Sequence, residues 1–128
     1  MKRGLLLFAH GARDPRWAVP FEDVADRVRV REPDVSVALA FLEFMSPGLI
    51  DAGRTLAAAT CTRVDVVPLF LGAGGHVRKD IPALLAQLRT EHPNVSWQLQ
   101  PAIGEQTLVI EAMAEASAAF LRSASNSL

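Results

Sequence analysis

Residues 66–82, V-V-P-L-F-L-G-A-G-G-H-V-R-K-D-I-P, decide the fold of this 128-residue chain. An apolar run typical of a buried strand ends at a cluster of glycines, and His76 follows the cluster directly. Glycines allow a sharp turn and let the backbone come close to a ligand. The pattern therefore predicts a strand that presents a histidine at its carboxyl end. Asp80 and Pro82 are expected to open the helix that follows.

The same arrangement recurs near the N-terminus, where a short apolar run ends in His10 and Gly11. Apolar runs of this kind are typical of strands that are buried on both faces. The four strands expected from them are residues 5–9, 35–44, 63–71 and 95–99. Pro68 lies inside the third of these strands and predicts a bulge or an unpaired amide at that point.

Helix-start signals follow the first two strands. Asp14 and Pro15 offer a cap and a first-turn proline, but Pro20 is unfavourable inside a helix, so the helix is either kinked there or starts near Val19. Ser46, with its following proline, repeats the signal for the second helix. The last helix is expected to start near residues 104–105. Its apolar side chains on one face are Val109, Met113, Ala116 and Phe120.

Strands alternating with helices predict an α/β fold in which a parallel sheet is covered on both faces. Ligands bind such sheets beyond the carboxyl ends of the strands. His10, Glu43 and His76 all fall at that edge. If the first strand lies between the second and third, the three residues are neighbours, because adjacent strands are only ~4.8 Å apart.

Composition excludes several classes of protein. Half of the residues are hydrophobic, which suits one globular domain over residues 1–122 with a frayed, serine-rich tail over residues 123–128. The formal net charge of −1 provides no basic field for nucleic acid. Cys61 is the only cysteine, which rules out an internal disulfide and suits a reducing compartment. No run is long enough to cross a membrane, so we expect a soluble, cytoplasmic protein.

Two histidines and a carboxylate at one sheet edge have two chemical interpretations. They suit a divalent metal with open coordination positions, or an acid–base site. Taken alone, either histidine is more often an exposed loop residue or a helix cap. Glu43 has a further alternative, since it can cap the next helix or bind an arginine.

The loops at this edge are also basic. Arg13, Arg78 and Lys79 come from the loops or the helix starts beside the histidines, and such side chains bind carboxylates or phosphates. These residues therefore have two interpretations, a binding site for an acidic ligand or an ordinary solvated surface. The glycine cluster at residues 72–75 lacks the Gly-Lys-Ser/Thr ending of a P-loop, so nucleotide binding is a weak interpretation.

Three motifs together, F-A-H-G-A-R-D-P at residues 8–15, F-L-E-F at residues 41–44 and the stretch quoted first, resemble the short sirohydrochlorin chelatases. These small class II chelatases insert cobalt, nickel or iron into a tetrapyrrole. The resemblance implies a three-layer α/β/α fold with a four-stranded parallel sheet of order 2-1-3-4. It also implies that His10 and His76 bind the metal and are catalytic, and that Glu43 is the family's acidic residue.

The resemblance implies a mechanism as well. The divalent metal is a substrate, no organic cofactor is needed, and a histidine or Glu43 takes the pyrrole protons. The carboxylates of a sirohydrochlorin-type tetrapyrrole would bind Arg13, Arg78 and Lys79, while Gly74 and Gly75 make room for the flat macrocycle. Longer relatives contain two such domains around one cleft, so a chain of this length implies a homodimer.

Two other functions remain open at this point. A metal or tetrapyrrole carrier on the same fold would keep the site without catalysis. Histidine phosphatases also have histidine-glycine after the first strand, but they place an arginine directly before the histidine, where this chain has Ala9.

Overall fold

The computed structural model describes residues 1–72 and 74–126 and, within them, every side chain except those of residues 75–78 and 124–126. The strands are β1 (Arg3–Ala9), β2 (Ser36–Phe41), β3 (Arg63–Pro68) and β4 (Ser96–Leu99). The α-helices are α1 (Val19–Arg31), α2 (Leu49–Ala58), α3 (Gly75–Glu91) and α4 (Thr107–Asn126). Two short 3-10 helices, η1 (Pro15–Ala18) and η2 (Ile103–Glu105), precede α1 and α4.

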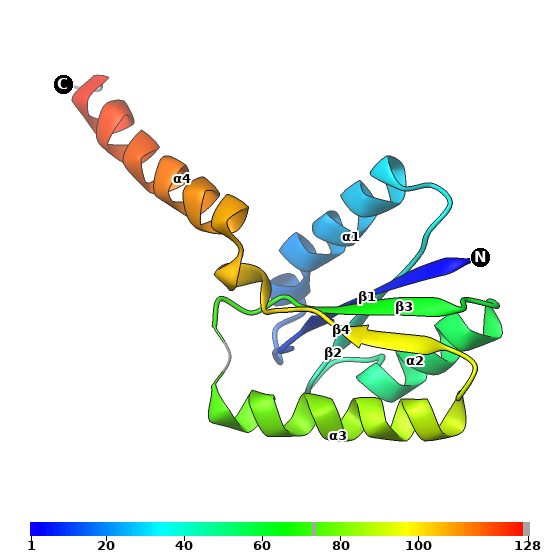
Figure 1. The fold of residues 1–128 in the computed structure, drawn as a ribbon. Helices are drawn as coiled ribbons and strands as arrows, with labels where there is room; N and C mark the ends of the chain where they lie inside the picture. Colours follow the sequence, from blue (N-terminus) through cyan, green and yellow to red (C-terminus); the bar gives the residue numbers. More distant parts are fainter. Residues whose placement is uncertain (73, 127–128) are drawn as a thin grey trace.

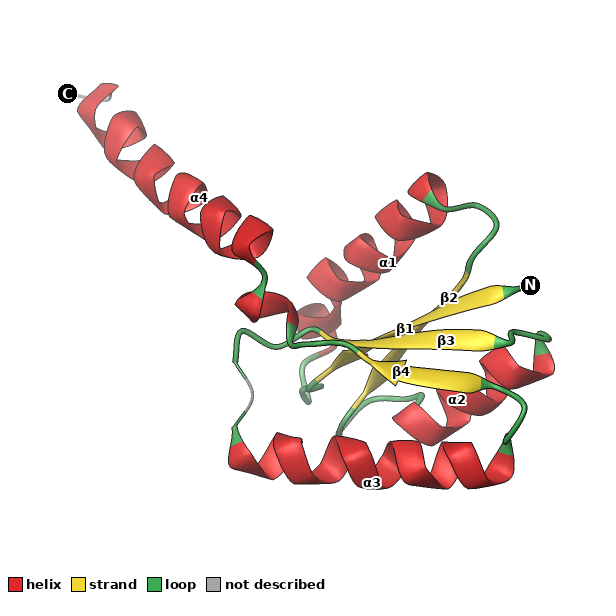
Figure 2. Cartoon of the chain, viewed as in Figure 1, coloured by secondary structure: helices red, strands yellow, loops and turns green. Residues whose placement is uncertain are grey.

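The four strands form one parallel sheet in the order β2-β1-β3-β4, which confirms the expected fold. Helix α1 lies on one face of the sheet, and α2 and α3 lie on the other (Figures 1 and 2). The first strand therefore does lie between the second and the third. This arrangement brings the carboxyl ends of β1, β2 and β3 to one edge.

The main core lies between the sheet and the α2–α3 layer. Leu6, Phe8, Val64 and Val66 are completely buried there and come from the two central strands. Trp97 of β4 extends the same cluster and is 2% exposed. Apolar runs in the central strands, rather than alternating ones, follow from burial on both faces.

Pro68 creates neither a bulge nor a broken ladder, because it is the last residue of β3. The neighbouring Leu69 N–H donates to the Phe8 carbonyl on the β1 side at 2.8 Å. Alternation along the strand places the missing N–H of Pro68 on the β4 side. On that side the last bond of the ladder joins the Gln100 N–H to the Val66 carbonyl at 2.9 Å. Pro68 therefore lies where the ladder ends rather than inside it.

Two helix starts differ from those expected. Helix α3 begins at Gly75, five positions before Asp80, so Pro82 lies inside the helix rather than in its first turn. Helix α2 begins at Leu49 with Gly48 at the cap position, and Ser46 is not its cap. In both cases the sequence contains a cap residue followed by a proline, but the helix begins at another residue of the loop that connects it to the sheet.

Other boundaries differ less. Helix α1 starts at Val19, as the second alternative for Pro20 required, and Asp14 caps the short helix η1 by accepting from the Arg16 backbone N–H at 2.9 Å. Strand β2 ends at Phe41, so Glu43 lies in the following loop and not in the strand. Residues 123–126 of the expected tail continue α4.

Helix α4 has its apolar residues on one face, as expected, but that face is not buried. Phe120 is 76% exposed and Met113 is 39% exposed. The helix projects beyond the carboxyl edge of the sheet (Figure 1). No helix in the described part of the chain combines the length and the apolar character that spanning a membrane requires.

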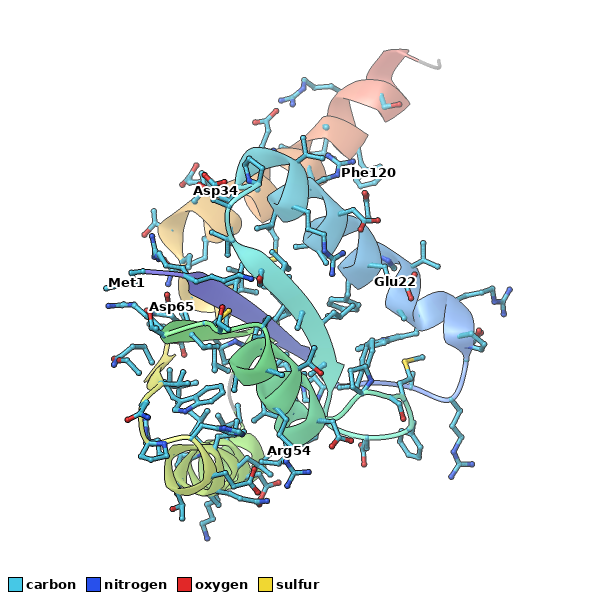
Figure 3. All side chains as sticks on the ribbon, turned by 90° about the vertical axis from the view of Figure 1, so that its right-hand side faces the viewer. Met1, Glu22, Asp34, Arg54, Asp65 and Phe120 are labelled. Atoms are coloured by element: carbon cyan, nitrogen blue, oxygen red, sulfur yellow. The ribbon has the colours of Figure 1, made fainter. Side chains whose placement is uncertain are left out.

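The second layer is held together at its surface by one arginine. Arg54, which is labelled in Figure 3, comes from α2. Its guanidinium donates to both carboxylate oxygens of Glu91 at the end of α3, at 2.9 and 2.7 Å. Hydrogen bonds from Arg54 and then Gln87 lower the pKa of Glu91 from 4.5 to about 2. A carboxyl whose pKa is lowered by folding stabilises the fold above its unfolded pKa and loses that contribution as the pH falls.

We expect Arg54→Met to destabilise the protein at pH 7 and to have less effect as the pH is lowered from about 4.5 towards 2. Urea unfolding followed by circular dichroism across this range measures the difference. Arg27→Met is the matched control, because Arg27 pairs with Asp23 inside one helix. A difference between wild type and Arg54→Met that stays the same at pH 7 and pH 3 would contradict this origin.

Candidate functional site

The carboxyl edge of the sheet brings the loops after β1 and β2 side by side. The ladder continues past the strands, with the Leu42 N–H donating to the Ala9 carbonyl at 2.9 Å and the Glu43 N–H donating to the His10 carbonyl at 3.0 Å. The two predicted site residues therefore lie next to each other through their backbones. Both side chains are exposed to solvent.

Gly11 makes this close approach feasible. Its φ of +89° lies in the left-handed region that side-chain-bearing residues rarely adopt. A Cβ atom at this position would stand 1.9 Å from the carbonyl oxygen of Glu43. The glycine after the histidine is thus required both by the turn and by the neighbouring loop.

The His10 ring has a fixed position because it packs on Phe70. The two ring centroids are 4.0 Å apart, with an angle of 33° between the planes. Phe70 is only 2% exposed and also contacts Phe8 in the core. One face of the imidazole is therefore held by the core while the residue remains open to solvent. Sequence analysis missed Phe70, which stood out only as part of an apolar run.

An arginine and an exposed aromatic ring form the rim beside His10. The Arg13 guanidinium carbon lies 5.1 Å from the centroid of the Phe44 ring, which is a cation–π distance. Phe44 is 58% exposed and has a φ of +66°, which is strained for a residue with a side chain. Leu71, 72% exposed, follows Phe70 at the same edge. The sequence indicated Arg13 but not Phe44, although Phe44 directly follows Glu43.

The glycine loop before α3 is open. A Cβ atom at Gly72 or at Gly74 would meet no atom within 4 Å, and neither residue has a positive φ. In the described structure, neither lack of space nor a special backbone conformation therefore requires glycine at these two positions. Gly74 is the cap residue of α3, whose N-terminus carries the positive end of the helix dipole.

The other predicted residues of this loop are only partly described. Gly75, His76 and Arg78 belong to the first turn of α3, but their side chains lie outside the described residues. Lys79 follows in the same helix and is exposed. Among the described side chains, no group of three or more histidines, cysteines or carboxylates is placed to hold a metal ion.

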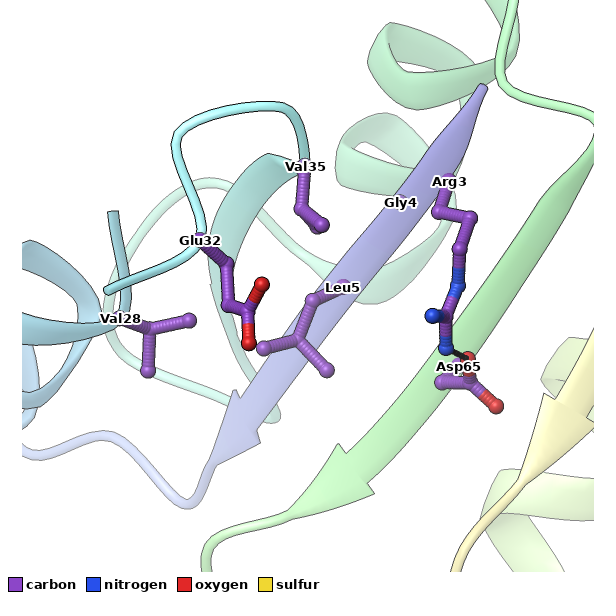
Figure 4. A pocket seen from close by; sticks show the side chains of 7 residues that line it. All are labelled: Arg3, Gly4, Leu5, Val28, Glu32, Val35 and Asp65. Atoms are coloured by element: carbon purple, nitrogen blue, oxygen red, sulfur yellow. Dashed lines mark ion pairs between the residues drawn. The ribbon is translucent and has the colours of Figure 1, made fainter. Parts of the chain in front are cut away.

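A separate pocket lies at the opposite, amino end of the strands (Figure 4). It is bounded by Leu5, by Val28 of α1 and by an ion pair of 3.7 Å between Arg3 and Asp65. Arg63 and Gln100 also donate to Asp65, at 3.1 and 2.8 Å. This polar cluster is internally satisfied and lies far along the strands from His10.

Comparison with known proteins places these features in a family. The family model CbiX matches residues 4–119. A sirohydrochlorin cobaltochelatase from Sulfurisphaera tokodaii is 30% identical over 126 residues, which cover 97% of this chain and 98% of that protein. The sirohydrochlorin cobaltochelatase of Methanosarcina acetivorans is 34% identical over 85 residues, covering 66% of this chain and 65% of that protein.

Solved structures agree in fold. A chain described as a cobalamin (vitamin B12) biosynthesis CbiX protein from Marinobacter aquaeolei matches with a TM-score of 0.82 and 30% identity, covering 94% of this chain and 98% of that one. The sirohydrochlorin chelatase SirB from Bacillus subtilis, solved in complex with cobalt, matches with a TM-score of 0.79 and 23% identity. That match covers 90% of this chain but only 49% of SirB.

Replacing Gly11 with alanine is expected to destabilise the protein by at least about 2 kcal/mol, through left-handed strain and overlap with the adjacent loop. Gly48→Ala is the matched control, since Gly48 has a φ of −79° and its nearest neighbour is 4.0 Å away. Urea unfolding of both variants measures the difference. Equal stability of the two variants would show that the His10 and Glu43 loops can separate without penalty.

Proposed function

This chain belongs to the CbiX family, and from that membership we propose that it is a sirohydrochlorin chelatase, which inserts cobalt, nickel or iron into the macrocycle. The observation that supports this function best is the edge where His10, held on Phe70, lies beside Glu43 and an arginine–aromatic rim. In this proposal, that edge would combine a metal ligand, a proton acceptor and a surface for a flat acidic molecule.

In this proposal His10 and His76 bind the incoming metal. Neutral imidazole is a good ligand for cobalt, nickel and iron, so the site does not select strongly among them. Stacking on Phe70 limits the orientations of the His10 ring, so less freedom is lost when the metal binds. His76 belongs to the first turn of α3 and follows the open glycine loop.

The macrocycle would lie over the strand ends. Phe44 and Leu71 offer exposed apolar surface to its flat face, and Gly74 leaves room beside it. Arg13 and Lys79 supply positive charge to the carboxylates of the substrate, with Arg78 as a third cation of the same helix start. The strained backbone of Phe44 is consistent with a residue whose position serves binding rather than stability.

Metal insertion requires two proton transfers. The two pyrrole N–H groups lose their protons as the divalent metal enters, so the ring becomes a dianion and the complex gains no net charge. Glu43 is exposed beside His10 and can accept a proton and release it to water. A histidine that has not yet bound metal is the alternative acceptor.

We also propose that the protein works in the cytoplasm as a homodimer. The sole cysteine, Cys61, is buried and unpaired, which suits a reducing compartment. The chain spans about half of SirB, so a second copy would supply the missing half of a comparable assembly. A carrier that binds metal or tetrapyrrole without catalysis is the second candidate, because the same contacts would serve it.

His10→Ala and His76→Ala are each expected to reduce metal insertion by at least about 100-fold. The control is His92→Gln, which changes the third histidine of the chain, next to the far end of α3. The assay follows the absorption spectrum of sirohydrochlorin with cobalt, nickel and iron in parallel. Wild-type binding of the tetrapyrrole without faster insertion would favour the carrier, and full activity in both alanine variants would refute the site.

Phe44→Ala and Arg13→Gln are each expected to raise the KM for sirohydrochlorin about tenfold, with a smaller effect on kcat. Only the Arg13 effect should shrink in high salt, because charge attraction is screened. Arg16→Gln is the control, since Arg16 pairs with Asp14 at 2.8 Å. An unchanged KM in both test variants would remove the rim from the substrate-binding surface.

A further inference from the structure

The contact between Phe70 and His10 is set by the register of the sheet. In the pairing of β1 with β3, Phe8 is opposite Pro68. Side chains two positions further along share the same face, so His10 comes opposite Phe70. The Leu69 N–H donates to the Phe8 carbonyl at 2.8 Å and continues the pairing beyond β3. The stacked rings are therefore a cross-strand pair at the carboxyl edge of the sheet.

The stack controls the plane of the His10 imidazole. Both ring nitrogens lie in that plane, so a metal that binds either of them must approach along it. Metal-binding histidines are usually oriented by a hydrogen bond from the second ring nitrogen. Within the described part of the chain the His10 ring makes no hydrogen bond, and its contact with Phe70 restricts its plane instead. A contact on the ring face does not occupy the nitrogens, which lie on the ring edge.

The Phe70 side chain has little freedom of its own. It is 2% exposed, and its ring also contacts Phe8, with the two centroids 6.0 Å apart. Both phenylalanines belong to the main core cluster between the sheet and the α2–α3 layer. Protein cores are close-packed, so the Phe70 ring can move only if its neighbours in the core move as well.

The backbone of Phe70 is held by η2, a segment far away in sequence. The Gly104 N–H donates to the Phe70 carbonyl at 2.9 Å. Gly104 is buried, and a Cβ atom there would stand 2.1 Å from the carbonyl oxygen of Leu71 and 2.4 Å from its Cα atom. A residue with a side chain at position 104 would therefore have to displace either η2 or residues 70–71.

We propose that Phe70 and Gly104 are positioning residues for His10. Gly104 fixes the Phe70 backbone, and the Phe70 ring sets the plane in which His10 offers a lone pair to the metal. Both residues are buried and act only through the histidine. This inference deepens the proposed function and rests on it for the role of His10 as a metal ligand.

Metal insertion should be sensitive to this positioning. Groups that act on a reacting atom need to be held within about 0.5 Å and about 10–20° of the productive geometry. Misplacement by about 1 Å can cost about 100-fold in rate. A His10 ring that rotates freely would therefore bind metal more weakly and deliver it more slowly, although the histidine itself is still present.

Ordinary core packing is the alternative role of Phe70, and it would affect stability alone. Phe70→Leu keeps an apolar side chain in the core but removes the flat surface under His10. Phe41→Leu is the matched control, because Phe41 is only 6% exposed and belongs to the smaller core cluster at the same edge. Both variants should lower the free energy of unfolding, but only Phe70→Leu should release the His10 ring.

The first test measures the His10 ring without metal or tetrapyrrole, by NMR relaxation of protein with labelled histidine. The ring should be ordered in the wild type and in Phe41→Leu, and mobile in Phe70→Leu. Gly104→Ala keeps Phe70, so loss of the ring-current shift of His10 in this variant would show that η2 holds the stack. Gly48→Ala is its control and should keep the shift. An ordered His10 ring in Phe70→Leu, or an unchanged shift in folded Gly104→Ala, would overturn the proposal.

The second test measures cobalt binding without tetrapyrrole and then metal insertion. Phe70→Leu should weaken cobalt binding and lower kcat about tenfold each, with little change in the KM for sirohydrochlorin. Phe41→Leu should stay close to the wild type in all three. Equal losses in both variants would mean core packing alone and would overturn the proposal. If the wild type inserts no metal while His10 order and cobalt binding still depend on Phe70, the proposed function fails and the positioning role stands.

Discussion

The site depends on one backbone contact, in which the Glu43 N–H donates to the carbonyl of His10 beyond the ends of β1 and β2. This contact extends the parallel ladder by one step into the loops. It exists only because Gly11 turns with a positive φ and offers no side chain to the opposing loop. The histidine and the carboxylate are thus held at adjacent positions by the sheet itself, before any side chain contributes.

The two faces of the sheet differ in how completely they are packed. Between the sheet and α2–α3, large side chains such as Trp97 and Phe8 are fully excluded from water, and Arg54 links the two helices at the surface. On the α1 face, Ala25 is the only fully buried residue of α1. The sheet is therefore closely packed on the side of α2 and α3. The site loops and α4 extend from the carboxyl edge of this sheet.

Much of this could be predicted from the sequence, because strand patterns and glycine signals act locally. The order of the strands could be predicted only from the family resemblance, because no single segment of the sequence indicates which strands are neighbours. The start of α3 was misplaced because Asp80 and Pro82 form a valid helix-start signal, whereas the helix already begins at Gly75. Phe70 on His10 and Arg13 on Phe44 were not predictable, because each contact joins segments far apart in sequence.

The isolation of α4 has a consequence for how the chain unfolds. A helix that packs only on η2 among the described elements shares little free energy with the sheet, so the two form separate cooperative units. In a single copy, α4 would exchange its amide hydrogens quickly and melt before the sheet.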